Sequence, residues 1–231
     1  MNQKSWAFRA GYFLVPSTAN ANTYDPRAIE RGEYAAELEL RYSLLSMAGK
    51  ARVFGWANQA LMGSYSESLQ TARLTGDTPD LATTRRGRTN YGIVFGLEQA
   101  LTEDLGVFSR ASWSPGKTEI IGWTDVHDSI SIGAVLKGTS WGRPNDRLAI
   151  GAVNEGLSKE SRRYLAAGGL GILIGDGALN YRREQVIETY YAYSLGKWST
   201  VSADYQLVIN PAYNIDRGPV SIYAMRFHAE F

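Results

Sequence analysis

The residues that could carry out catalysis in this sequence are few. His127 stands two and four positions before Ser129 and Ser131, and this is the one pairing of a potential base with potential nucleophiles that the sequence suggests. The other histidine, His228, lies close to the C-terminus. No GxSxG motif presents a serine at a sharp turn between a strand and a helix. Because the chain also has no cysteine, it offers no thiolate nucleophile, and the sequence gives an enzyme little support.

Metal and nucleotide binding find equally little support. The two histidines and the lack of cysteine argue against a zinc-type site. Asp176, together with Asp77, Asp80 or Asp204, could supply oxygen ligands for calcium, but the spacing matches no EF-hand. The glycines of segment 155–183 fit no GxxxxGK[ST] phosphate loop. Lys and Arg number 24 against 23 Asp and Glu, so the basic excess of a nucleic-acid-binding protein is missing, and we expect no metal, cofactor or nucleic-acid partner.

The elements that must position these residues are strands. Apolar and polar residues alternate over many short stretches, which is the period of a β-strand with one apolar face. At the C-terminus, for example, Tyr223, Met225 and Phe227 alternate with Arg226 and His228. With weaker stretches near 51–60, 105–114 and 146–154 included, the pattern predicts about ten strands.

The connections between the predicted strands alternate in length. Short turns at one end and long loops at the other are typical of outer-membrane β-barrels, whose turns face the periplasm. We therefore predict an all-β chain that forms an antiparallel transmembrane β-barrel, with Phe231 at the periplasmic end. No apolar run approaches the roughly 18 residues of a membrane helix. The short connections lie near 43–49, 100–104, 138–145 and 196–197, and the long ones near 16–32, 61–88, 115–127, 155–183 and 210–219.

Several long segments carry a resemblance to a known family. They are RYLAAGGLGILIGDGALNYRREQVIETYYAY (163–193), DYQLVINPAYNIDRGPV (204–220) and the terminal Phe231, while WGRPNDRLAIG (141–151) and RAGYFLVP (9–16) look similar to the same family. On these segments the chain resembles the OprB-type carbohydrate-selective porins of Gram-negative outer membranes over almost its whole length.

The resemblance implies a function without catalysis, namely passive diffusion of sugars through a water-filled channel in the cell outer membrane. The family barrel has about sixteen strands after a signal peptide, so residues 1–231 are expected to be a single porin domain from which N-terminal strands and signal peptide are missing. The family suggests a monomer, other porins are trimers, and the sequence leaves both open. Besides membrane lipids, the expected partner is the outer-membrane assembly machinery, because Phe231 resembles the signal that it reads.

The polar face of the predicted strands supplies the candidate channel-lining residues. It carries charges of both signs, which suits a neutral polyol better than an ion. Trp56 shares this face with Phe54 and Arg52, and an aromatic ring there could stack on a sugar. The predicted channel-lining residues are Arg9, Glu37, Glu39, Arg41, Trp56, Glu98, Arg110, Arg147, Glu188, Asp204, Gln206 and Arg226.

Two other functions stay open. Periodicity does not say whether the apolar face points outward to lipid or inward, as in a soluble or surface-exposed β-barrel that binds a ligand. Extraction without detergent would indicate the second arrangement. An outer-membrane hydrolase could instead place His127 beside Ser129 or Ser131 at the barrel rim, and turnover of an ester would indicate it.

Overall fold

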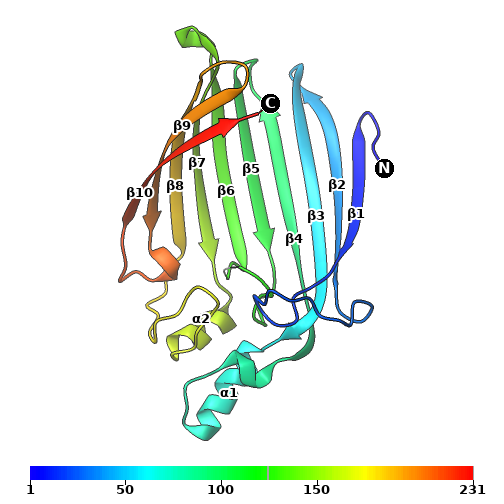
Figure 1. Cartoon of the computed structure of the whole chain (residues 1–231), viewed down its shortest axis with the longest axis vertical. Helices are drawn as coiled ribbons and strands as arrows, with labels where there is room; N and C mark the ends of the chain where they lie inside the picture. Colours follow the sequence, from blue (N-terminus) through cyan, green and yellow to red (C-terminus); the bar gives the residue numbers. More distant parts are fainter. Residues whose placement is uncertain (124, 231) are drawn as a thin grey trace.

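Ten strands in one antiparallel sheet make up most of the molecule. The computed structural model describes residues 1–123 and 125–230, and within them each strand pairs with its neighbour in sequence, so that the spatial order runs from β1 to β10. The predicted all-β fold of about ten antiparallel strands is confirmed (Figure 1). The strands are β1 Trp6–Phe13, β2 Glu33–Leu44, β3 Met47–Met62, β4 Arg86–Ala100, β5 Leu105–Trp113, β6 Asp128–Gly138, β7 Arg143–Gly156, β8 Glu184–Ser194, β9 Ser199–Ile209 and β10 Val220–Ala229.

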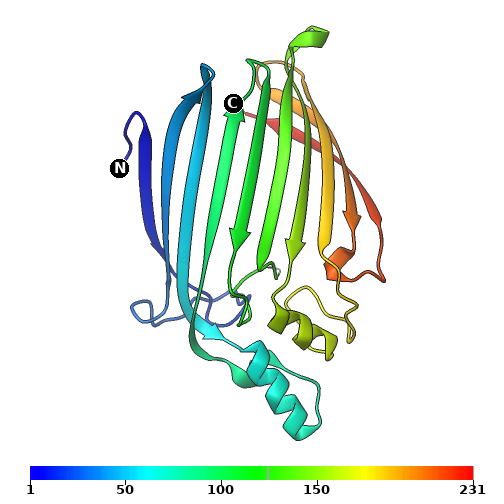
Figure 2. The same cartoon turned by 180° about the vertical axis from the view of Figure 1, so that it is seen from behind.

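The sheet is strongly curved. The strands β9 and β10 swing in front of the sheet in Figure 1 and lie behind it in the reverse view of Figure 2. Within the described residues β1 and β10 each pair with one strand only, so they form the two edges of the sheet. The proposed assembly signal at Phe231 lies outside the described residues.

The two ends of the sheet differ as the connection lengths predict. Short turns at 45–46, 101–104, 139–142 and 195–198 gather at one end, where β1 also begins and β10 ends, and we call it the turn end (Figure 1). At the opposite end, the loop end, lie the long connections 14–32, 63–85, 114–127, 157–183 and 210–219. Three of these connections, 63–85, 157–183 and 210–219, share a hydrophobic core.

The long connections contain helices that the alternation pattern does not predict. The helix α1, Tyr65–Thr75, begins at Ser64, whose hydroxyl oxygen accepts a hydrogen bond from the Glu67 amide at 3.4 Å. The helix α2, Lys159–Ala166, begins in the same way at Ser158. Three short 3₁₀ helices are η1 Leu81–Thr84, η2 Thr139–Trp141 and η3 Pro211–Tyr213. In the part of the chain that the structure describes, no helix has the length and apolar character needed to cross a membrane.

The main hydrophobic core lies among the loops and not against the sheet. It joins both helices to the connections that follow β7 and β9, and each of its members is less than a tenth exposed. This core fixes the loop end as a packed layer across the end of the strands. Its buried members are Tyr65, Leu81, Leu157, Tyr164, Leu165, Ile174 and Tyr213.

One face of the sheet is apolar and exposed along its whole width. Phe95 is 50% exposed, Ile132 64% and Ile150 57%, although all three lie inside strands. We call this surface the apolar face and the opposite surface the polar face. A soluble β-barrel would bury its apolar face in the interior. The exposed arrangement is instead the one in which the apolar face meets lipid.

Candidate functional site

The strand register places all twelve predicted channel-lining residues on the polar face. Because directly paired residues share a face of a sheet, the face can be followed from strand to strand. Arg9 pairs with Glu37 and Glu37 with Phe54, which puts β1 to β3 in line. Glu188 pairs with Gln206, and the same alternation carries the polar face through β8 and β9. The sequence prediction that these residues share one face agrees with this register.

Glu39 is the centre of an ion-pair network on β1 to β3. Its carboxylate accepts hydrogen bonds from Arg41 Nε at 2.7 Å and Arg52 Nε at 3.0 Å, and lies 3.5 Å from Arg9 Nη1. Arg9 Nη1 also donates to Glu37 at 2.7 Å. The Glu39 residue is only 4% exposed because the three guanidinium groups cover it. The network therefore presents its positive groups, and not this carboxylate, to the solvent.

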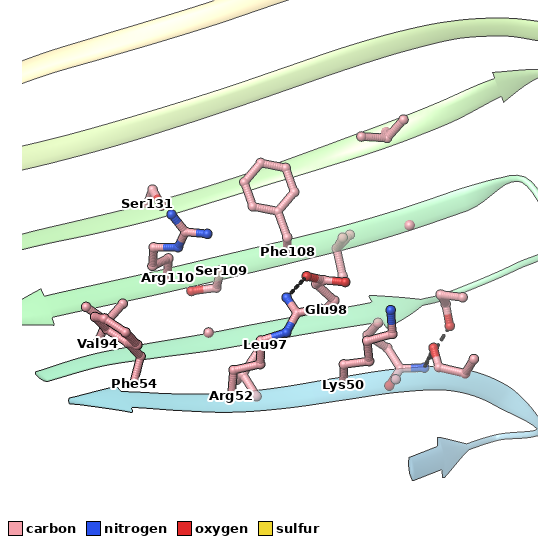
Figure 3. Close-up of a pocket in the computed structure, with 18 of the residues that line it drawn as sticks. Lys50, Arg52, Phe54, Val94, Leu97, Glu98, Phe108, Ser109, Arg110 and Ser131 are labelled. Carbon is pink, nitrogen blue, oxygen red and sulfur yellow. Dashed lines mark hydrogen bonds and ion pairs between the residues drawn. The ribbon is translucent and has the colours of Figure 1, made fainter. Parts of the chain in front are cut away.

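The network continues across the sheet into a cavity of about 890 Å³ (Figure 3). Arg52, which already contacts Glu39, also forms an ion pair with Glu98 on β4. Lys50 and Arg110 line the same cavity, and their side chains make no hydrogen bond or ion pair with any described residue. Their charged groups are thus available to a solute. Because this cavity opens on the polar face, that face is the hollowed side of the sheet.

Two aromatic rings on the polar face lie close to glycines of the neighbouring strand. A Cβ atom at Gly92 would lie 2.7 Å from the ring of Trp56, its direct partner in the sheet. The ring of Phe108 lies over Gly133 in the same way. Glycine permits this close approach because it has no side chain. The rings are thereby held against the strands while they face the open side.

The remaining predicted residues form a separate group. Glu188, Asp204, Gln206 and Arg226 lie on β8, β9 and β10, on the same face as the Glu39 network but across β5 to β7 from it. Arg147 joins neither group, because its Nη1 donates to the backbone oxygens of Pro144 at 2.9 Å and Asp146 at 2.7 Å. Arg147 therefore stabilises the backbone of β7 near the turn end.

Several residues of this surface, Lys50, Arg52 and Phe108 among them, are absent from the sequence-based set. Lys50, Arg52 and Phe108 line the large cavity, and Figure 3 shows them pointing to the same side of the sheet. Arg52 lies two residues before Phe54 and four before Trp56, and this spacing on one strand face is a signal that could have added Arg52 to the set. Phe108 could not be found this way, because an aromatic residue in a weakly alternating segment gives no indication of its face.

The pairing of His127 with a nearby serine is not formed in the structure. His127 is 2% exposed, and its Nδ1 accepts a hydrogen bond from the Ser158 amide at 3.1 Å. Burial lowers the pKa of His127 to about 4. Ser129 bonds through its hydroxyl to Ser112 at 2.7 Å, and Ser131 lies on the polar face beside Arg110. His127 therefore holds two loops together at this site.

The sequence leaves calcium binding by Asp176 and other aspartates as a minor possibility, but these carboxylates form no cluster among the described residues. Asp176 forms an ion pair with Arg217, which satisfies its carboxylate. Over residues 1–123 and 125–230 no three His, Cys, Asp or Glu side chains lie close enough together to hold a metal ion.

Solved structures of outer-membrane proteins resemble this chain to different degrees. The structure of OprB from Pseudomonas putida, determined at high pH, aligns with a TM-score of 0.79 and 16% sequence identity over 99% of this chain and 56% of that chain. The chain thus spans just over half the length of that protein. The toluene transporter TodX of P. putida aligns over 92% of this chain and 67% of that chain with a TM-score of 0.34 and 10% identity, which is too low to bear on the fold. No curated protein matches the sequence.

A family model decides the assignment that the segments quoted above suggest. The model described as carbohydrate-selective porin, OprB family, matches residues 1–231. The fold likeness to P. putida OprB and the exposed apolar face agree with this match. The chain belongs to the OprB family of carbohydrate-selective porins, and its location is the outer membrane.

Proposed function

We propose that the polar face lines a water-filled channel through which sugars diffuse passively across the outer membrane. The observation that carries the proposal is the pairing of a mixed-charge, hollowed face with an exposed apolar face on the same ten strands. An apolar face in lipid and a polar face toward water is the arrangement of transmembrane β-barrels with an aqueous interior. Diffusion of this kind needs no catalytic group.

The charges of the polar face suit a neutral, hydroxyl-rich solute. Arg52 is shared between Glu39 and Glu98, so much of the positive charge is already neutralised. Lys50 and Arg110 remain as hydrogen-bond donors toward the cavity, and Ser131 adds a hydroxyl. Such groups can replace part of the hydration of a sugar and still release it, which is what conduction requires.

The two aromatic rings add a second kind of contact. Trp56 and Phe108 lie on the same face as the charged groups, and each ring is close to a glycine of the next strand. The apolar C–H face of a pyranose can pack on such a ring, as apolar ligand groups pack on the aromatic walls of binding sites. We infer that these rings form low-affinity steps along the path of the sugar.

Membrane lipids are the inferred partner of the apolar face. Aromatic pairs stand near the ends of this face: Tyr12 with Tyr34 at 4.8 Å between ring centroids at the loop end, and Trp141 with Tyr191 at 6.3 Å at the turn end. Aromatic girdles at both interfaces are characteristic of membrane barrels. Because the loop core joins connections that follow β3, β7 and β9, we further propose that residues 1–231 act as one domain.

Liposome swelling tests the function. The chain is refolded into liposomes, and swelling is followed in a series from arabinose to a trisaccharide. The proposal predicts swelling that slows as the sugar grows, and an altered sugar series for Arg110→Ala but not for Glu103→Gln, a substitution in an exposed turn. The proposal would be contradicted if the folded protein gave no swelling, or if the rate of swelling did not depend on the size of the sugar.

A further inference from the structure

Gly96 lies in a row of paired residues that crosses the polar face. It pairs directly with Arg52 on one side and with Arg110 on the other, and Arg110 pairs in turn with Ser131. Directly paired residues share a face of the sheet, and Figure 3 shows Arg52, Arg110 and Ser131 on the same side. All four residues line the large cavity of about 890 Å³. Gly96 is therefore a part of the cavity floor without a side chain, and an arginine stands on each side of it.

The local geometry does not require glycine at position 96. The residue lies inside β4 and does not have a positive φ, so other residues could adopt its backbone conformation. Among the described residues, a Cβ atom there would have one neighbour within 4 Å, the Cβ atom of Arg52 at 3.9 Å, which is an ordinary contact. Gly92 on the same strand differs, because the ring of Trp56 covers it. Position 96 thus has free space above its backbone.

Glycine inside a strand has a cost that another residue would avoid. It loses more conformational entropy on folding than any other residue, and it offers no side chain to pack. Such a glycine often marks a place where a ligand or another backbone approaches closely. Apart from the chain neighbours of Gly96, no described backbone atom lies within 4 Å of its Cβ position. The close approach at this position is therefore left to a solute in the cavity.

The two arginines form unequal walls of the gap over Gly96. Arg52 is held in place by ion pairs with Glu39 and Glu98. Arg110 has no such partner among the described residues, so its guanidinium group is free to contact a solute. Because neighbouring strands lie about 4.8 Å apart, the backbones of the two arginines stand roughly 10 Å apart across β4. A solute in the gap would thus meet one fixed and one free guanidinium group.

We propose that Gly96 is a specificity-determining residue, because the gap over it limits the size of the solute that passes between Arg52 and Arg110. The inference rests on the proposed function, since it needs a solute that moves along the polar face. Gly96 carries no charge, hydroxyl group or ring, and it acts only through the space that it leaves open. A side chain at position 96 would narrow this path, so a large solute would be slowed more than a small one.

Gly55 supplies a matched control on the adjacent strand β3. It pairs with Ala36 and with Ile93, which lies two residues from Phe95 of the apolar face, so Gly55 is on the apolar face. Within the described part of the chain, a Cβ atom there would meet only the backbone oxygen of Gly92, at 4.0 Å. Position 55 is therefore as open as position 96. A leucine at 55 adds the same side chain to the same sheet, but on the side that faces lipid.

Liposome swelling with Gly96→Ala, Gly96→Val and Gly96→Leu tests the inference. The measured quantity is the ratio of the swelling rate with a trisaccharide to the rate with arabinose, because this ratio does not depend on how many channels insert. We expect the ratio to fall in the order alanine, valine, leucine, and severalfold for Gly96→Leu, whereas Gly55→Leu keeps the ratio of the unaltered chain. Circular dichroism checks the fold of each variant. If leucine prevents folding, Gly96→Ala still tests the inference, because its Cβ atom makes no close contact.

The outcomes separate this residue from the channel as a whole. Size-dependent swelling of the unaltered chain, with the same ratio in the folded Gly96 variants, would overturn the role of Gly96 and leave the proposed function. An equal fall of the ratio in Gly96→Leu and Gly55→Leu would also overturn that role, because position 55 lies outside the cavity. A folded, unaltered chain without size-dependent swelling would overturn both the proposed function and the inference that rests on it.

Discussion

At the scale of single residues, Glu39 connects the arginines of β1, β2 and β3 on the polar face. Three guanidinium groups from three adjacent strands converge on its carboxylate, and two of them have a second acidic partner in Glu37 or Glu98. Such a network neutralises charge locally, and the three arginines share the one buried carboxylate of Glu39. Removing a partner from a close network leaves the others without compensation.

Glu39→Gln should therefore make the channel more selective for anions. Three positive groups would remain around a neutral amide, and anions would be favoured over cations in the lumen. The reversal potential in a salt gradient measures this change, with Glu103→Gln in the exposed turn as the matched loss of one carboxylate. An equal shift in both variants would mean that Glu39 acts only through net charge and not through its place in the network.

Sequence periodicity could predict the face of each residue but not its partner. Alternation decides the side of the sheet, and it groups all twelve predicted residues on one side, as the strand register does. Partners depend on strand register, which no local pattern contains, so Arg147 looks equivalent to Arg110 in the sequence although its guanidinium is bound to backbone near a turn. Lys50, which lines the large cavity, is missed because the predicted strand near 51–60 begins one residue after it.

At the scale of elements, adjacent residues of one strand lie in two different environments, because their side chains point to opposite faces of the sheet. On β6, Ser131 lies on the polar face and lines the large cavity, whereas Ile132 lies on the apolar face and is 64% exposed. Both are near the middle of the strand. The difference between the faces can therefore be measured within one element.

Ile132→Lys should destabilise the folded protein, and Ser131→Lys should not. A lysine on the lipid face costs roughly 2–4 kcal/mol at the bilayer midplane, whereas a lumen-facing lysine stays in water. Urea unfolding in lipid vesicles, followed by tryptophan fluorescence, gives the two free energies of unfolding. If the two variants lost equal stability, the face assignment would be wrong.

The contact between His127 and α2 is the element-scale feature that responds to pH. The Ser158 amide donates to His127 Nδ1, so this nitrogen must be unprotonated. Tyr65 of α1 packs edge-on against the imidazole at 6.0 Å between ring centroids. The facing charged groups are Asp128 beside His127 and Glu160 in α2, and both favour protonation, but burial outweighs them and the pKa falls to about 4.

Lowering the pH from 7.5 to 4.5 should loosen α2. The unfolded histidine takes up a proton below about 6.5 and the folded one only below about 4, so stability is lost as the pH falls between these values, by at most about 2.5 kcal/mol at pH 4.5. Hydrogen exchange of α2 amides measures this loss relative to His127→Asn, whose amide oxygen can still accept from Ser158. The raised pKa of Asp125 acts in the opposite direction but is common to both proteins. Identical pH dependence in the two would rule out His127 as the cause.

The helices are the elements that sequence periodicity could not predict. The patterns of 61–88 and 155–183 indicate long loops, because each helix is short and lies between irregular segments. Ser64 with Glu67 three residues later is the local signal for the start of α1. The core that joins the helices depends on contacts between distant segments such as Tyr65 and Tyr213, which no local pattern reveals.

At the scale of the whole molecule, the alternation of apolar and polar residues along the strands gives the sheet one apolar and one polar face. The polar face carries the cavity and its charges, the apolar face carries exposed side chains, and the loops close over one end with their own core. The unpaired edges of β1 and β10 bound this surface within the described residues. The proposed sugar transport and the proposed lipid contact both depend on which face meets water.

Cysteine labelling in liposomes tests that assignment most directly, because the protein has no cysteine and each substitution creates a unique thiol. Ser131→Cys, Ile132→Cys and Glu103→Cys would be exposed to a water-soluble maleimide before and after detergent is added. We predict that the thiols at 131 and 103 react in the bilayer, while the thiol at 132 reacts only in detergent. Reaction at 132 with protection at 131 would place lipid on the polar face and contradict the assignment of the two faces.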